Sequence, residues 1–150
     1  MKSFKAIALL LFLSISVFTQ SKTEIPKDWK KFSNDSFSFY APVTLKKQDV
    51  RGIDSFVEEY KNEDFTVEFD YGWYENTAGN CDEPISVSVD KQAAKICFYK
   101  DEEIDKEKPF VTAISFLKLG KQTKFTFWVL SKTEALQKEA EKIVRSIEFK

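Results

Sequence analysis

The chain has 150 residues, of which 23 are lysine or arginine and 24 are aspartate or glutamate, so its formal net charge is −1. This near-balance offers no broad electrostatic surface for nucleic acid or for an anionic membrane. Histidine is absent, which excludes histidine-containing catalytic triads and histidine-ligated zinc sites. Fifteen phenylalanines, three tryptophans and five tyrosines supply the core of one ordinary domain.

Residues 1–21 have the pattern of a secretory signal peptide. Lys2 and Lys5 form a charged start, residues 6–18 are apolar, and residues 19–21 offer equally readable cleavage positions. The thirteen-residue apolar run is shorter than the about 20 residues that a membrane-spanning helix needs. No cysteine lies near the cleavage positions to accept a lipid. We therefore expect a soluble exported protein, periplasmic or secreted, with no stable membrane insertion after cleavage.

The chain contains two cysteines, Cys81 and Cys97. An even number of cysteines in an oxidising compartment favours a disulfide between them. The alternative is two separate buried thiols. A metal site needs more thiolate or imidazole ligands than the chain has, so we expect no metal and no cofactor.

A single globular domain is expected over residues 29–150, after a flexible polar lead-in over residues 22–28. Its first predicted element is a hairpin whose strands have the sequences WKKFS and FSFYA, with a turn at residues 34–36. Pro42 ends the second strand because proline lacks the N–H that a strand ladder needs. A polar loop follows over residues 46–54.

Strict alternation of apolar and polar residues predicts a second hairpin, which turns at residues 62–64. Glu68 and Asp70 share the polar face of its second strand, where we expect them to be solvated. Glu58 and Glu59 face opposite sides of its first strand, so they form no carboxylate pair. This hairpin is therefore predicted to have one apolar face against the core.

Residues 72–84 form the most conspicuous loop, with two glycines and a proline. Alternating strands are then expected at residues 85–89 and 94–98, on either side of a turn at residues 90–92. The charged run over residues 100–108 is interpreted as a solvated loop.

The last predicted hairpin pairs residues 110–119 with residues 123–130. Both strands carry large apolar groups on both faces, which places them in the middle of a layered domain. Ser131 and Glu134 match a capping box for an amphipathic helix of about fourteen residues that packs across the sheet, and residues 147–149 are expected to form a short edge extension. The predicted fold class is α+β, with a largely antiparallel sheet and a C-terminal amphipathic helix.

Four segments together resemble the PsbP-like fold family, which includes DcrB-like envelope proteins: FSNDSFSFYAP, GIDSFVEEY, FTVEFDYGWYE and EAEKIVRSIEF. The resemblance covers residues 29–150. It implies an α/β/α sandwich in which residues 46–54 or 100–108 supply a second helical layer. It also implies a non-enzymatic accessory or binding protein of an exported compartment. No functional residue of the photosynthetic members can be matched, so no photosynthetic function is expected.

The strongest partner-binding candidates are Tyr71, Trp73, Tyr74 and Glu75. Aromatic rings beside a carboxylate at the base of a loop suit a binding surface, because they offer a large contact area at low entropic cost. The alternative is that Tyr71 and Trp73 cap the core. A calcium site is a weaker possibility because its oxygen donors match no EF-hand spacing. Those donors are Asp70, Glu75, Asn76, Asn80, Asp82 and Glu83.

We expect a non-enzymatic binding or accessory module of the cell envelope, whose partner is a protein or an envelope component and not nucleic acid. An immunity or inhibitor protein that binds a toxin or a hydrolase is the alternative. A histidine-free hydrolase is the third candidate, using a carboxylate pair or a serine with a lysine base. The four glycines form neither a phosphate-binding loop nor a GxSxG elbow, which disfavours this candidate.

Overall fold

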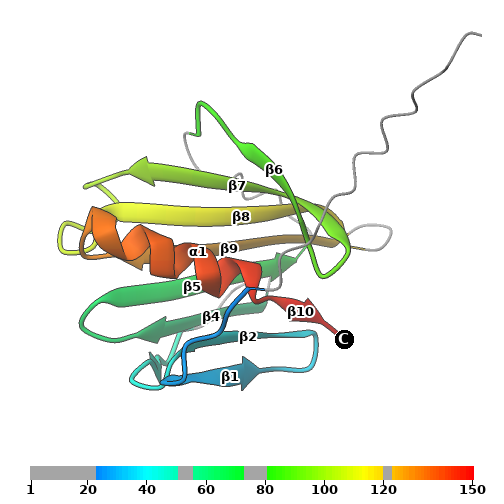
Figure 1. Ribbon diagram of the computed structural model, residues 1–150, viewed down its shortest axis with the longest axis horizontal. Coiled ribbons are helices and arrows are strands. Elements are labelled where there is room, and N and C mark those ends of the chain that lie inside the picture. The colour runs from blue at the N-terminus through cyan, green and yellow to red at the C-terminus, as the bar shows by residue number, and fades with distance from the viewer. Residues whose placement is uncertain (1–22, 51–55, 73–80, 120–122) are drawn as a thin grey trace, which may run out of the picture.

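The computed structural model describes residues 23–50, 56–72, 81–119 and 123–150. These residues form two antiparallel sheets and a C-terminal helical segment, which confirms the predicted α+β class with largely antiparallel pairing. Figure 1 shows the helix lying across one face of the larger sheet, with the smaller sheet beside it. The predicted signal peptide lies outside the described residues.

The large sheet has the strand order β3-β4-β5-β9-β8-β7-β6, and the small sheet has the order β1-β2-β10. The strands of the large sheet are β3 (Lys46–Lys47), β4 (Phe56–Lys61), β5 (Phe65–Gly72), β6 (Ile85–Val89), β7 (Gln92–Lys100), β8 (Phe110–Leu119) and β9 (Thr123–Ser131). Those of the small sheet are β1 (Trp29–Ser33), β2 (Phe37–Pro42) and β10 (Glu148–Phe149). A 3-10 turn, η1 (Glu134–Leu136), leads into the helix α1 (Gln137–Arg145).

Asparagine side chains build the turns of the first two predicted hairpins, β1–β2 and β4–β5. Asn34 Oδ1 accepts hydrogen bonds from the backbone N–H groups of Ser36 and Phe37 at 2.9 and 3.0 Å. Asn62 Oδ1 accepts the equivalent pair, at 3.0 and 2.6 Å. Because these side chains replace missing backbone partners at the turn, both hairpins form where the sequence predicts them.

The turn between β6 and β7 consists of Asp90 and Lys91, which have positive φ angles of 46° and 63°. Two consecutive residues in the left-handed region form the tight turn whose twist matches that of an antiparallel hairpin. Aspartate tolerates this conformation better than most residues. The predicted hairpin is confirmed, with Gln92 already belonging to β7.

Phenylalanines of β2 join the small sheet to the large one. Phe37 is fully buried, and its ring centroid lies 4.7 Å from that of Phe69 and 4.6 Å from that of Phe125. The ring of Phe39 lies 5.0 Å from that of Phe127. The core therefore lies between the two sheets and beneath the helix.

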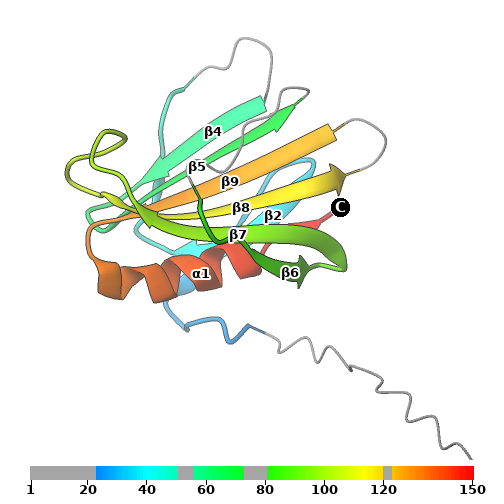
Figure 2. The same ribbon diagram turned by 90° about the horizontal axis from the view of Figure 1, so that it is seen from above.

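The helix covers the same face of the large sheet as β2 does. Ala140, Ile143 and Val144 are completely buried on α1, which packs against β8, β9 and β2. Figure 2 shows the helix and the large sheet as two layers. The strands β8 and β9 lie in the middle of the large sheet, as their two apolar faces predict.

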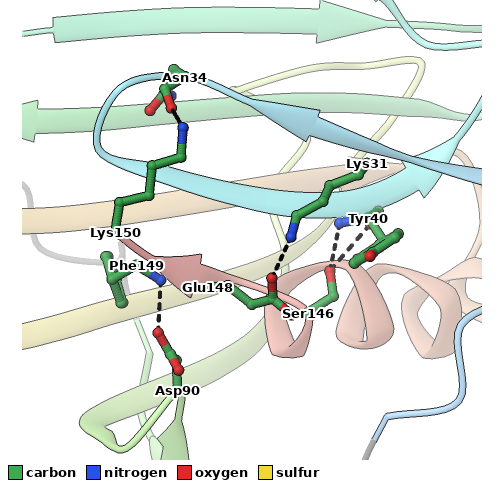
Figure 3. Close-up of polar contacts among 8 residues, drawn as sticks. All are labelled: Lys31, Asn34, Tyr40, Asp90, Ser146, Glu148, Phe149 and Lys150. Carbon is green, nitrogen blue, oxygen red and sulfur yellow. Dashed lines mark hydrogen bonds and ion pairs between the residues drawn. The ribbon is translucent and has the colours of Figure 1, made fainter.

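The short strand β10 connects the helix, the small sheet and the large sheet (Figure 3). Glu148 forms an ion pair with Lys31 of β1 at 2.5 Å. The backbone N–H of Phe149 donates to Asp90 Oδ2 at 2.7 Å, which ties β10 to the turn between β6 and β7. At the end of α1, Ser146 Oγ accepts a hydrogen bond from the N–H of Tyr40 at 2.8 Å. The predicted edge extension is thus confirmed as a strand paired with β2.

The predicted capping box is wrong. Ser131 is the last residue of β9, where it lies opposite Phe65 of β5 and Phe110 of β8. Strand pairing on both sides therefore keeps Ser131 in an extended conformation. Thr133 precedes the 3-10 turn and makes no side-chain cap hydrogen bond, and α1 covers nine residues rather than about fourteen.

The second helical layer implied by the family resemblance is not found where it was expected. Lys100 ends β7, and residues 101–108 form turns and bends. The backbone N–H of Asp101 donates to the carbonyl of Pro109 at 2.8 Å and closes this loop. In the other segment, Lys46–Lys47 forms the strand β3, and residues 51–54 lie outside the described part of the chain.

Replacing Phe37 with alanine should lower the free energy of unfolding by about 3–5 kcal/mol, because it opens a cavity between the two sheets. Urea denaturation measures this loss. Val43→Ala is the control: Val43 is 51% exposed, so its substitution should change stability by less than about 0.5 kcal/mol. Equal effects of the two substitutions would contradict the assigned role of Phe37.

Candidate functional site

Of the four predicted partner-binding residues, only Tyr71 lies in the described part of the chain. It is half-buried in β5 and packs against the main core, with its ring centroid 5.7 Å from that of Phe125. This position agrees with the alternative in which Tyr71 caps the core. Trp73, Tyr74 and Glu75 lie outside the described residues, so their role in binding stays a prediction.

The predicted disulfide is present between Cys81 and Cys97, with a Cα–Cα distance of 5.7 Å. Cys97 is buried on the face of β7 opposite α1, where it belongs to a second apolar cluster with Val111, Ala113 and Leu130. Trp128 packs against this cluster. The disulfide therefore fixes the chain just before β6 to the side of the large sheet that the helix does not cover.

We call this side of the large sheet the outer face. A row of directly opposed residues crosses it from β4 to β7. The row consists of Glu59, Glu68, Trp128, Ala113 and Cys97, in that order. Two carboxyl groups, an indole ring and the disulfide are thus aligned on one face.

Glu59 and Glu68 form a carboxyl pair on the outer face. Burial raises the pKa of Glu68 to about 7, and the hydrogen bond with Glu59 together with its negative charge adds to the rise. Lys61 acts in the opposite direction, and its amine lies 3.0 Å from Glu59 Oε1. Near neutral pH, protonated and ionised forms of Glu68 therefore coexist.

The loop over residues 101–109 lies near the carboxyl pair. Asp105 Oδ1 accepts hydrogen bonds from the backbone N–H groups of Glu107 and Lys108 at 2.8 and 3.1 Å. The negative charge of Asp105 is one of those that raise the pKa of Glu68, which places this loop near the carboxyl pair. The predicted solvated loop is exposed at Ile104, but it buries Lys108.

Sequence reasoning missed the Glu59–Glu68 pair, although the alternation places each of the two residues on the polar face of its strand. The predicted turn at residues 62–64 would place Lys61 opposite Phe65. In the structure the backbone N–H of Asn62 donates to the carbonyl of Phe65 at 3.0 Å, and this register places Glu59 opposite Glu68. Our sequence interpretation compared carboxylates only within a strand. The position of the loop over residues 101–109, by contrast, has no local sequence signal.

The chemistry of these groups favours binding over catalysis. Glu59 and Glu68 are in hydrogen-bond contact, whereas the carboxyl groups of retaining glycosidases stand about 5–5.5 Å apart around their substrate. Ser86 lies opposite Lys95, but both side chains are exposed, whereas a catalytic lysine is typically buried. The outer face is thus better suited to recognising a cationic group than to activating a nucleophile.

Comparison with known proteins gives no relative: no protein-family model matches the chain, and no curated protein matches it. Within the described ranges, no group of three or more cysteine, aspartate or glutamate side chains is able to hold a metal ion. Three of the six oxygen donors weighed for calcium lie outside those ranges, namely Glu75, Asn76 and Asn80. No helix in the described part of the chain is long and apolar enough to cross a membrane.

Reducing the disulfide should lower the free energy of unfolding by roughly 3 kcal/mol, because the cross-link restricts the unfolded chain. The measurement is urea denaturation with and without a thiol reductant. The double variant C81A/C97A is the control, and its unfolding should not respond to the reductant. An unchanged midpoint for the reduced native protein would show that the cross-link has no stabilising role.

The carboxyl pair should make the protein less stable as the pH rises from 4.5 to about 7. Over this interval the folded state binds more protons than the unfolded state, so the free energy of unfolding falls with pH. Because Glu68 is only partly buried, the total loss should be about 1–2 kcal/mol. In Glu68→Gln the loss should disappear, as measured by urea denaturation at pH 5 and pH 8. Glu63→Gln, in an exposed turn, should keep the native pH dependence.

Proposed function

We propose that this protein is an exported, non-enzymatic binding or accessory module of the cell envelope, and that its outer face contacts a protein or an envelope component. The observation that supports the proposal is the row in which the Glu59–Glu68 pair, Trp128 and the disulfide lie side by side. Aromatic side chains next to desolvated charges are typical of the residues that dominate binding energy.

The carboxyl pair indicates the chemistry of the partner. A lysine or arginine of the partner placed against Glu68 would replace the shared proton and stabilise both carboxylates. Binding should therefore strengthen as the pH rises through about 7, the pKa of Glu68.

The disulfide supports the export part of the proposal. Such a bond persists in oxidising compartments and is rare in the cytosol, and the first 21 residues have the signal-peptide pattern. The mature protein would then act in a periplasm or outside the cell. Cleavage of the signal peptide would leave it untethered.

The proposal includes the PsbP-like resemblance. It is supported by an antiparallel sheet whose last central strand leads into a single packed helix and a short closing strand. In that family, accessory and binding roles are the rule.

Site-specific photo-crosslinking in the native envelope tests the role of the outer face. A photoreactive residue in place of Lys95, exposed on the outer face, should capture the partner. The same residue in place of Lys138, exposed on α1, is the matched control and should capture nothing. Equal capture from both positions would contradict the proposal.

Two variants test which residues bind. E59Q/E68Q should weaken capture and remove its dependence on pH, whereas W73A/Y74A should weaken capture with little change in melting temperature. A large fall in the melting temperature of W73A/Y74A would assign those two side chains to the core instead. A single partner captured in stoichiometric amounts would favour the inhibitor alternative, and several weak partners would favour the accessory role.

A further inference from the structure

The edges of the two sheets differ in how they are protected from pairing with another chain. Natural proteins blunt exposed edges with short strands or with lysine. At one end of the large sheet, β3 has two residues, both lysine. In the small sheet, β1 contains Lys30 and Lys31, and β10 has only two residues. The remaining edge is β6, and it has neither kind of protection.

The strand β6 has the sequence ISVSV, without charge, proline or glycine. Among the described residues it pairs only with β7, so one side of its backbone has no strand partner. Ile85 is 50% exposed, and Ser86 and Ser88 are exposed as well. The tight turn at Asp90 and the disulfide at Cys81 hold the two ends of this region in place. The strand β6 is therefore uncharged, has high β-propensity and is fixed in position, so its free edge is available for pairing with another strand.

The sequence of β6 is self-complementary about Val87. In an antiparallel pair centred on this residue, Val87 of one copy lies opposite Val87 of the other, and Ile85 lies opposite Val89. Ser86 then lies opposite Ser88 on the outer face. Apolar residues thus meet apolar residues and hydroxyl groups meet hydroxyl groups, which are favourable cross-strand pairs.

The residues that flank β6 leave the line of the strand. Asp90 and Lys91 form the tight turn at one end, and residues 82–83 form a bend at the other. Pro84 marks the end of the pairing because it lacks a backbone donor. The register is therefore set by the five residues of β6 alone.

We propose that two copies of this chain associate through antiparallel pairing of their β6 strands, so that the large sheet continues across a twofold axis. An isologous contact of this kind closes on itself and stops at a dimer. Five residues from each copy make a small interface, so the association is weak and depends on concentration. The pairing extends the sheet edge to edge and leaves both outer faces accessible, which makes it independent of the proposed function.

Charge substitutions on the exposed serines test both the interface and its register. In the proposed pair, S86K/S88K places lysines opposite lysines, whereas S86K/S88E places opposite charges across the axis. Sedimentation equilibrium of the exported, disulfide-bonded chain should show a monomer–dimer equilibrium for the native protein. We expect S86K/S88K to weaken it about tenfold or more, and S86K/S88E to associate at least as tightly as the native protein.

Controls separate this effect from a loss of folding. Both double variants place a lysine opposite Lys95 of β7, so any fall in melting temperature at a concentration where the protein is monomeric should be similar in the two. Ser33→Lys, on the edge strand β1, should leave the equilibrium unchanged. A native protein that stays monomeric at every accessible concentration would overturn the proposal, as would S86K/S88E associating as poorly as S86K/S88K. If the native protein stays monomeric but binds a strand-forming segment of another protein through β6, the partner of this edge is that segment and not a second copy.

Discussion

The small and large sheets are held together by phenylalanine rings, and the rest of the structure depends on this contact. Phe37 lies against Phe69 and Phe125, with no part of its side chain exposed. Such aromatic pairs contribute about 0.5–1.5 kcal/mol each beyond the burial of their area. The hairpin β1–β2 is too small to be stable by itself, so it exists because its phenylalanines are buried against the large sheet.

This arrangement assigns different tasks to the two faces of the large sheet. The inner face packs against β2 and α1, and its buried carboxylate, Glu58, is paired with Lys47 and Tyr60. The outer face has no such cover among the described helices. Its carboxyl pair and its disulfide are therefore placed on a rigid base, because the strands beneath them are fixed from the other side.

Much of the fold follows from local patterns. Alternation together with asparagine turns predicts β1–β2 and β4–β5, because turn chemistry locates the loop and strand periodicity locates the strands. The disulfide follows from an even number of cysteines in a chain that begins with the signal-peptide pattern. The predictions that are wrong concern residues whose conformation depends on contacts distant in the sequence. Ser131 matches a helix cap, but its pairing with Phe65 and Phe110 extends β9 through it. No local pattern shows that β1–β2 belongs to a separate sheet, since that depends on packing.

The candidate site on the outer face is likewise predictable from the sequence only in part. Alternation places Glu59 and Glu68 on the polar faces of their strands, but their pairing depends on the register that the hydrogen bond from Asn62 N–H to the Phe65 carbonyl sets. The raised pKa of Glu68 depends on burial and on Asp105, a residue from a loop far along the chain. The role of β6 as an edge is likewise a property of the strand order. Periodicity identifies β6 as a strand but does not say which strands lie beside it.

The disulfide also restricts how β6 is able to move. Cys81 and Cys97 close a covalent ring that contains all of β6, its turn and residues 92–97 of β7. Exchange of β6 between two copies by opening the hinge at Asp90 would carry Cys81 away from its own Cys97. Domain swapping of this strand is therefore prevented while the bond is intact, and reduction is the condition under which it becomes accessible.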